Sequence, residues 1–185
     1  VEAVVEILDD LNIHRAHVVG NSLGGLVTLL AAERYPARVV SVVASGVPGF
    51  KDKIDLGIPL RLHPSYEFAC TLTSRIFPDA TVLSPAMIAR CLADISPPDT
   101  YMNMLRSLRT ARDYDIAPGL PAINQDILLV FGEQDVITPV TNWANNLALL
   151  RHGRLECIPM AGHSPQIDRP AEFGALLLDF LRRQV

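Results

Sequence analysis

Two kinds of apolar pattern alternate along the first and last parts of this chain. Short runs that are apolar at nearly every position are typical of strands buried on both faces of a parallel sheet. They fall at residues 16–20, 39–44, 126–132 and 154–159. Segments with apolar residues at helical spacing separate them, at residues 1–11, 23–35, 140–150 and 171–183. The alternation predicts an α/β fold with a parallel sheet of about four strands.

The middle of the chain has a different pattern. Nine of the fourteen prolines fall between residues 48 and 121, and the apolar spacing there is short and helical. The helical segments are residues 67–77, 85–95 and 101–112. We therefore expect three or four short helices, joined by proline turns, as an insertion at 48–121. This insertion separates two core segments, residues 1–47 and 122–185.

Composition and charge exclude several classes of protein. Hydrophobic residues make up 49% and charged residues 19%, which is typical of a globular domain. A net charge of -4 leaves no basic surplus for nucleic acid. No apolar run approaches the ~20 residues that a membrane span needs. Neither a basic leader nor a C-x-x-C pair is present, so we expect a cytoplasmic protein without a disulfide framework or a metal site.

The strongest chemical signal is the segment Gly20-Asn21-Ser22-Leu23-Gly24-Gly25. It contains G-x-S-x-G between an expected strand and an expected helix, which is the context of a nucleophile elbow. We expect glycine two residues either side of the serine because a Cβ there would collide with backbone. The turn would expose the Ser22 hydroxyl and aim the Leu23 N–H at a developing oxyanion. A phosphate-binding loop is the alternative, but no P-loop lysine or dinucleotide fingerprint accompanies it.

A serine nucleophile needs a histidine base and a carboxylate that orients the histidine. In hydrolases with a nucleophile elbow, the serine comes first along the chain, the aspartate or glutamate second and the histidine last. Asp135 follows the run that ends at residue 132, and His163 follows the run that ends at residue 159. Because parallel strands place their carboxyl ends at one edge, we expect Ser22, Asp135 and His163 to form the catalytic site. The weaker alternatives for the acid are Glu133 and Asp126. The other histidines are expected to be structural, although His63 could face the substrate; they are His14, His17, His63 and His152.

These motifs resemble those of the capped α/β hydrolases. The matching blocks are residues 16–25, 128–139, 161–166 and 170–173. The resemblance implies that 48–121 is a helical lid over the active site. It also implies that the chain is the C-terminal part of an α/β-hydrolase parallel sheet, without the first four strands. A truncated chain of this kind would lack the second oxyanion N–H, which comes from a loop after the third strand.

Within that family the nucleophile sorts the chemistry, and serine implies acyl substrates or carbon–carbon bonds beside a ketone. We expect a carboxylic ester hydrolase that acts on a small-molecule acyl substrate and uses no metal or organic cofactor. The Gly-Asn-Ser-x-Gly-Gly elbow also resembles that of hydrolases acting on ring-fission products of aromatic degradation. Those enzymes often carry an aromatic residue just after the histidine, where this chain has Ser164.

Two readings from other classes stay open at this point. One is a hydrolase-like small-molecule receptor, and the other is a fragment that does not act alone. The substrate and the oligomeric state are equally open. Apolar residues of the insertion are expected to line either the pocket or the lid's own core, namely Leu60, Tyr66, Phe68, Met87, Tyr101 and Met104.

Overall fold

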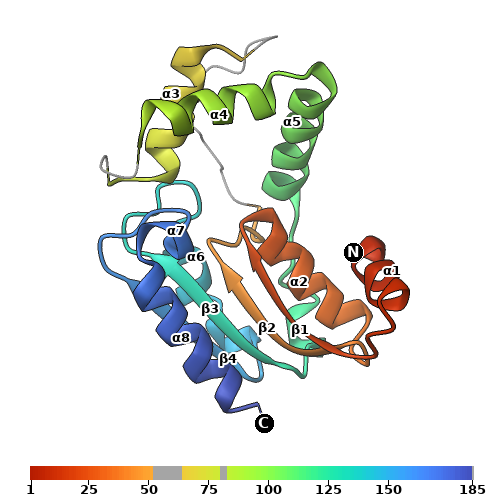
Figure 1. Ribbon diagram of the computed structural model, residues 1–185. Helices are drawn as coiled ribbons and strands as arrows, with labels where there is room; N and C mark the ends of the chain where they lie inside the picture. The colour runs from red at the N-terminus through yellow and green to blue at the C-terminus, as the bar shows by residue number, and fades with distance from the viewer. Residues whose placement is uncertain (52–63, 80–82, 185) are drawn as a thin grey trace.

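The computed structural model describes residues 1–51, 64–79 and 83–184, and its centre is a parallel sheet. Four strands pair side by side in the order β1-β2-β3-β4 (Figure 1). Their bounds are β1 (Ala16–Asn21), β2 (Val39–Ser45), β3 (Asp126–Gly132) and β4 (Gly153–Ile158). Each lies within one residue of its expected position, so the α/β class and the four-stranded parallel sheet are confirmed.

Helices connect the strands, as the spacing predicts, with one correction. The helices α1 (Glu2–Asp10), α2 (Leu23–Arg34) and α8 (Pro170–Arg182) agree with the expected segments. The single helix expected at residues 140–150 is wrong. That segment forms the short helix α6 (Thr141–Ala144) and a separate 3₁₀ turn, η3 (Leu147–Leu149). Two asparagines, which favour helices poorly, lie at the break.

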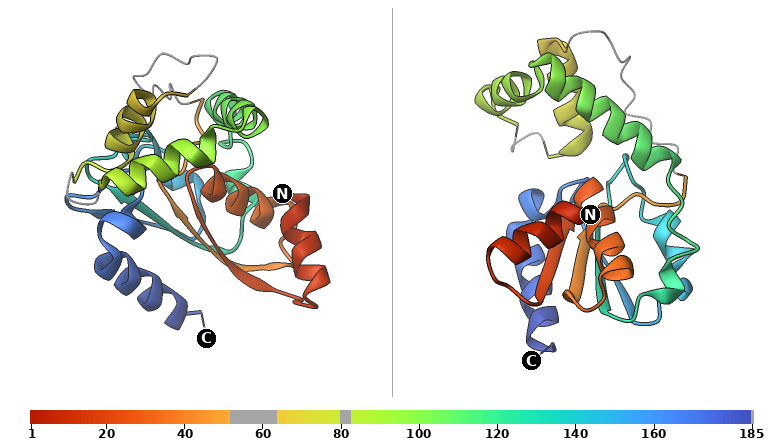
Figure 2. Two further views of the ribbon diagram at one scale, coloured as in Figure 1. Left: turned by 45° about the horizontal axis from the view of Figure 1, so that its top comes forward. Right: turned by 90° about the vertical axis from the view of Figure 1, so that its right-hand side faces the viewer.

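Side chains of β3 alternate between two apolar layers, one on each face of the sheet. Ile127, Leu129 and Phe131 pack into a cluster with residues of α2 and α6. Leu128 and Val130 pack into a second cluster with residues of α8. The right-hand view of Figure 2 shows α8 on one side of the sheet and α6 on the other. Because both faces are covered, the strand is apolar at every position from residue 127 to residue 131.

Three helices lie over the carboxyl edge of the sheet and are called the cap helices below (Figures 1 and 2). They are α3 (Tyr66–Ile76), α4 (Pro85–Ile95) and α5 (Pro98–Asp113). Ser65 and Ser84 cap α3 and α4 by accepting hydrogen bonds of 3.1 Å from Phe68 N and Met87 N. The connections into and out of these helices run together, because Phe50 and Asp115 form an antiparallel bridge. The expected boundaries of the insertion, residues 48–121, stay a prediction.

The cap helices have an apolar cluster of their own. Phe68 and Tyr101 are buried and meet edge to face, with ring centroids 5.9 Å apart. Ile137, from the segment after β3, joins this cluster and so ties the cap helices to the core. Met104 packs against the cluster and lines the pocket described below, whereas Tyr66 is exposed. Leu60 and His63 lie outside the described residues. No helix in the described part of the chain is long and apolar enough to cross a membrane.

Candidate active site

The carboxyl edge of the sheet gathers the three residues that the sequence predicts to form the catalytic site. In the paired register, Asn21 at the end of β1 lies beside Ser45 at the end of β2. Ser45 in turn lies beside Val130, and Gly132 beside Ile158. The segments that follow β1, β3 and β4 therefore start from the same edge. They carry Ser22, Asp135 and His163 respectively.

Ser22 has the strained backbone of a nucleophile elbow. Its φ of 55° and ψ of -124° are uncommon for a residue with a side chain, and its N–H donates to Ser45 O at 2.8 Å. A Cβ at Gly20 would stand 2.3 Å from Gly24 O, so glycine is required there. The expectation for Gly24 is wrong, because a Cβ there would meet nothing within 4 Å. Gly25 is the tight position instead, where a Cβ would lie 3.1 Å from the Val47 Cβ.

Leu23 begins α2 directly after the serine. The first N–H groups of a helix have no partner within the helix and carry a partial positive charge. Leu23 also lines the pocket that contains Ser22. The residue expected to supply the oxyanion donor is therefore at the pocket wall.

Asp135 is 5% exposed and is bonded through both carboxyl oxygens. Oδ1 accepts from Ile137 N at 2.8 Å and from Thr138 N at 2.9 Å. Oδ2 accepts from Thr138 Oγ1 at 2.8 Å and lies 3.0 Å from His163 Nδ1. Burial acts to raise the pKa of Asp135, but the bonds from His163 and Thr138 outweigh it and hold that pKa below its ordinary value. The rival acids Glu133 and Asp126 are exposed.

Thr138 is a site residue that the sequence reasoning missed. Its Oγ1 lies 2.8 Å from Asp135 Oδ2, 2.9 Å from Gly46 O and 3.1 Å from His163 Nδ1. The hydroxyl has one proton, which it gives to Gly46 O or to Asp135, so a lone pair remains for the imidazole. The His163 Nδ1–H then faces two acceptors, Asp135 Oδ2 and Thr138 Oγ1. This favours the tautomer in which His163 Nε2 carries no proton.

Gly46, immediately after β2, is the second missed residue. Its φ is +50°, a conformation that glycine adopts without strain. A Cβ there would lie 2.8 Å from His163 O and 3.1 Å from His163 Nδ1. The absence of a side chain thus lets the histidine approach the end of β2. A glycine directly after an apolar strand is the signal that could have drawn attention to it.

The segment that carries His163 is fixed by contacts from three other elements. Asn21 Nδ2 donates to His163 O at 2.9 Å, and His163 N donates to Ile76 O at 3.0 Å. The neighbouring Gly162 N donates to the buried Asp168 Oδ2 at 2.7 Å. Burial raises the pKa of Asp168 despite that bond. Asn21 therefore positions His163 through its backbone carbonyl, and Asp168 holds the residue before it.

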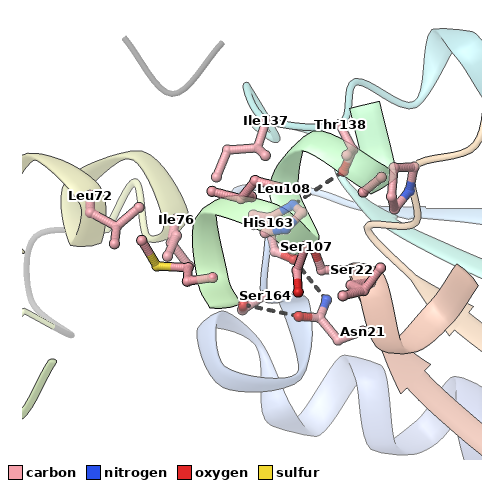
Figure 3. Close-up of a pocket in the computed structure, with 14 residues that line it drawn as sticks. Asn21, Ser22, Leu72, Ile76, Ser107, Leu108, Ile137, Thr138, His163 and Ser164 are labelled. Atoms are coloured by element: carbon pink, nitrogen blue, oxygen red, sulfur yellow. Dashed lines mark hydrogen bonds between the residues drawn. The ribbon is translucent and has the colours of Figure 1, made fainter. Parts of the chain in front are cut away.

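Ser22 and His163 line one cavity of about 330 Å³, and Figure 3 shows the residues around it. Asp135 is not among its lining residues and bonds the far side of the imidazole. In the described part of the chain, the Ser22 hydroxyl has no hydrogen-bond partner. Catalytic hydrogen bonds are often long in free enzymes and tighten when substrate binds.

The wall opposite the sheet edge is mainly apolar. Leu72 and Ile76 come from α3, and Met104, Leu108 and Ala111 come from α5. Of the other histidines, His17 Nδ1 lies 2.7 Å from Ser41 Oγ, away from this cavity. Neither His14 nor His152 is among the described lining residues. The remaining candidate, His63, is outside the described part.

Comparison with known proteins finds a family whose sequence pattern matches this chain. The sequence model described as the alpha/beta hydrolase family matches residues 1–176. A 2-hydroxy-6-oxo-6-phenylhexa-2,4-dienoate hydrolase of Comamonas testosteroni is 29% identical over 98% of this chain and 68% of its own length. The chain thus spans about two-thirds of that relative.

Solved structures show the same fold. A meta-cleavage product hydrolase from Pseudomonas fluorescens IP01 superposes with a TM-score of 0.86 at 22% identity, covering 98% of this chain and 70% of its own. Est816, described as an N-acyl homoserine lactone degrading enzyme, has a TM-score of 0.74 at 25% identity over 96% of this chain and 71% of its own.

Proposed function

The chain belongs to the alpha/beta hydrolase family, and from that premise we propose that it is a serine hydrolase of carboxylic esters or related acyl compounds. One observation carries the proposal. His163 is bonded to the buried Asp135 at 3.0 Å and lines the same cavity as the strained Ser22. A nucleophile, a base and an orienting carboxylate are the parts that acyl transfer requires.

The first half of the proposed reaction acylates the serine. Ser22 Oγ attacks the substrate carbonyl carbon while His163 Nε2 takes the hydroxyl proton. The carbonyl oxygen becomes an oxyanion, which the Leu23 N–H stabilises. The tetrahedral intermediate collapses, the bond to the leaving alcohol breaks, and His163 returns its proton to the alcohol oxygen. Asp135 stays ionised and stabilises the transient imidazolium.

The second half releases the acid. A water molecule gives its proton to His163 Nε2 and attacks the acyl-enzyme carbonyl. The second tetrahedral intermediate collapses with cleavage of the bond to Ser22 Oγ, which recovers the proton from His163. The depressed pKa of Asp135 supports this cycle, because the carboxylate stays charged at neutral pH.

We assign the cap helices the role of a lid over this site. Leu72, Met104 and Leu108 from α3 and α5 supply the apolar wall that faces Ser22. A wall of this kind excludes water and accepts an apolar acyl chain or leaving group.

A second candidate is hydrolysis of a carbon–carbon bond in ring-fission products. Its support is the 29% identity to the Comamonas dienoate hydrolase. A dienoate carries a carboxylate, which needs a cation or several hydrogen bonds when it is buried. Within the described parts of the chain, no lysine or arginine lines the cavity, and this favours an ester over a dienoate as the substrate.

A two-substrate assay tests the proposal. Hydrolysis of p-nitrophenyl esters of increasing chain length is compared with cleavage of 2-hydroxy-6-oxo-6-phenylhexa-2,4-dienoate. We expect many turnovers of an ester per site and a loss of about 10⁴-fold or more in kcat for Ser22→Ala. Ser74→Ala, an exposed helical serine away from the cavity, serves as the matched control. Ester turnover that survives in Ser22→Ala would sink the proposal, and faster turnover of the dienoate would establish the second candidate.

A further inference from the structure

Two hydroxyl groups line the cavity without a hydrogen-bond partner in the described part of the protein. They belong to Ser22 and Ser107. The other polar side chains of the wall are engaged within the protein. Asn21 donates to Ser45 and His163, and Thr138 donates to the Asp135 carboxylate. Ser22 is accounted for as the nucleophile, whereas Ser107 has no role so far.

Ser107 lies on the face of α5 that forms the cavity wall. Met104, Ser107, Leu108 and Ala111 are spaced as one helical stripe, and all four line the cavity. Three of them are apolar, and the other cap residues that line the described wall, Leu72 and Ile76, are apolar as well. Ser107 is therefore the single polar side chain that the described cap helices contribute (Figure 3).

The unbonded state of Ser107 contrasts with that of other hydroxyls in these helices. A helical serine or threonine can donate back to a carbonyl three or four residues earlier. Thr110, also on α5, donates to Arg106 O at 3.0 Å, and Ser74 on α3 donates to Thr71 O at 2.9 Å. Ser107 makes no such bond within the described structure. Its donor and its acceptor lone pairs are both available to a molecule in the cavity.

We propose that Ser107 is a specificity-determining residue, whose hydroxyl binds a second neutral oxygen of the substrate. The substrate class is an acyl compound with an apolar body and one ketone, hydroxyl or ether oxygen apart from the scissile carbonyl. A neutral group is specified because no lysine, arginine, aspartate or glutamate lines the described wall to pair with a buried ion. The assignment of substrate class rests on the proposed hydrolase function.

The size of the expected preference follows from the chemistry of one neutral hydrogen bond. Such a bond changes a binding constant by about 2- to 10-fold. The preference should be positional, since a hydroxyl fixed on α5 can reach only one part of a substrate whose carbonyl sits at Ser22. An oxygen elsewhere along an apolar chain loses its hydration and gains nothing in return.

The experiment measures binding and turnover separately. The probes are p-nitrophenyl octanoate and its isomeric keto derivatives, in which one methylene at a time is replaced by a carbonyl. Their dissociation constants are measured by calorimetry on Ser22→Ala protein, which retains the cavity and does not turn them over. One isomer should bind better than the others, and adding Ser107→Ala should lower the ratio of its affinity to that of the octanoate by about 2- to 10-fold.

Two variants keep this result interpretable. Ser107→Thr retains a hydroxyl and should retain most of the preference, while Ser74→Ala should leave the ratio unchanged. Equal losses for the keto ester and the plain ester in Ser107→Ala, or no preferred isomer at all, would overturn the proposal. A different observation would refute the hydrolase function, namely that the parent protein, with Ser22 present, does not turn over esters.

Discussion

Replacing Thr138 with valine removes one hydroxyl and leaves the shape of the side chain almost unchanged. The hydroxyl lies within 3.1 Å of the His163 imidazole, the Asp135 carboxylate and Gly46 O. Thr138 is 3% exposed, so water cannot easily replace the lost bonds. Each buried polar group left unpaired costs about 1–3 kcal/mol. Asp135 keeps its two backbone bonds, and we therefore expect the free energy of unfolding to fall by roughly 2–4 kcal/mol.

A loss of that size is measurable in two ways. For a chain of this length it lowers Tm by roughly 4–16 °C, since 1 kcal/mol corresponds to about 2–4 °C. The same substitution removes one of the two acceptors that face His163 Nδ1. We expect kcat for ester hydrolysis to fall by about 10- to 100-fold, because small errors in the position of a catalytic group are costly.

Thr138→Ser is the matched control, because it keeps the hydroxyl and loses only a methyl group. Urea unfolding followed by circular dichroism gives the stability of both variants, and a p-nitrophenyl ester gives kcat. The serine variant should lie closer to the parent protein in both measurements. A valine variant that loses no more stability and activity than the serine variant would refute the reasoning, since the hydroxyl would then contribute no more than the methyl group.

Four further substitutions probe the backbone and the charges of the site. Gly46→Ala should lower kcat by at least about 10-fold, because the new Cβ would lie 2.8 Å from His163 O at a φ of +50°; unchanged kcat would contradict this. Gly24→Ala should be neutral or stabilise the fold by up to about 1 kcal/mol, whereas Gly20→Ala should prevent folding or destabilise it severely; thermal melts that rank the two the other way would be decisive against the elbow geometry. Asp135→Asn should lower stability at neutral pH, and its difference from the parent protein should shrink as pH falls below about 4. The folded pKa of Asp135 is depressed, so its stabilising contribution is present above the unfolded pKa of ~3.9 and is lost as pH falls through the folded value. A difference that stays constant between pH 3 and 7 in urea titrations would argue against it.

The sheet could be predicted from sequence because its strands are apolar on both faces. Residues 127–131 form one uninterrupted apolar run followed by a glycine, and β3 (Asp126–Gly132) contains that run. Short elements gave no such signal. The segment at 140–150 has helical spacing, yet it divides into α6 and η3 at two asparagines, whose low helix propensity the apolar spacing does not register.

The candidate site was predictable to the extent that it depends on local motifs and their order. Ser22, Asp135 and His163 each follow a strand, and a parallel sheet brings such positions to one edge. Gly46 and Thr138 could not be predicted as site residues, because their importance arises from contacts between residues far apart in the sequence. A glycine after β2 and a threonine three residues beyond Asp135 acquire their roles only when His163 packs against both.

Labelling with a fluorophosphonate tests the central claim most directly. The reagent is attacked by an activated serine, loses fluoride and leaves a covalent adduct that intact-mass spectrometry counts. We predict one adduct per chain, none in Ser22→Ala, and much slower labelling in His163→Ala. A parent protein that stays unlabelled, or an adduct that persists in Ser22→Ala, would contradict the assignment of Ser22 as the nucleophile.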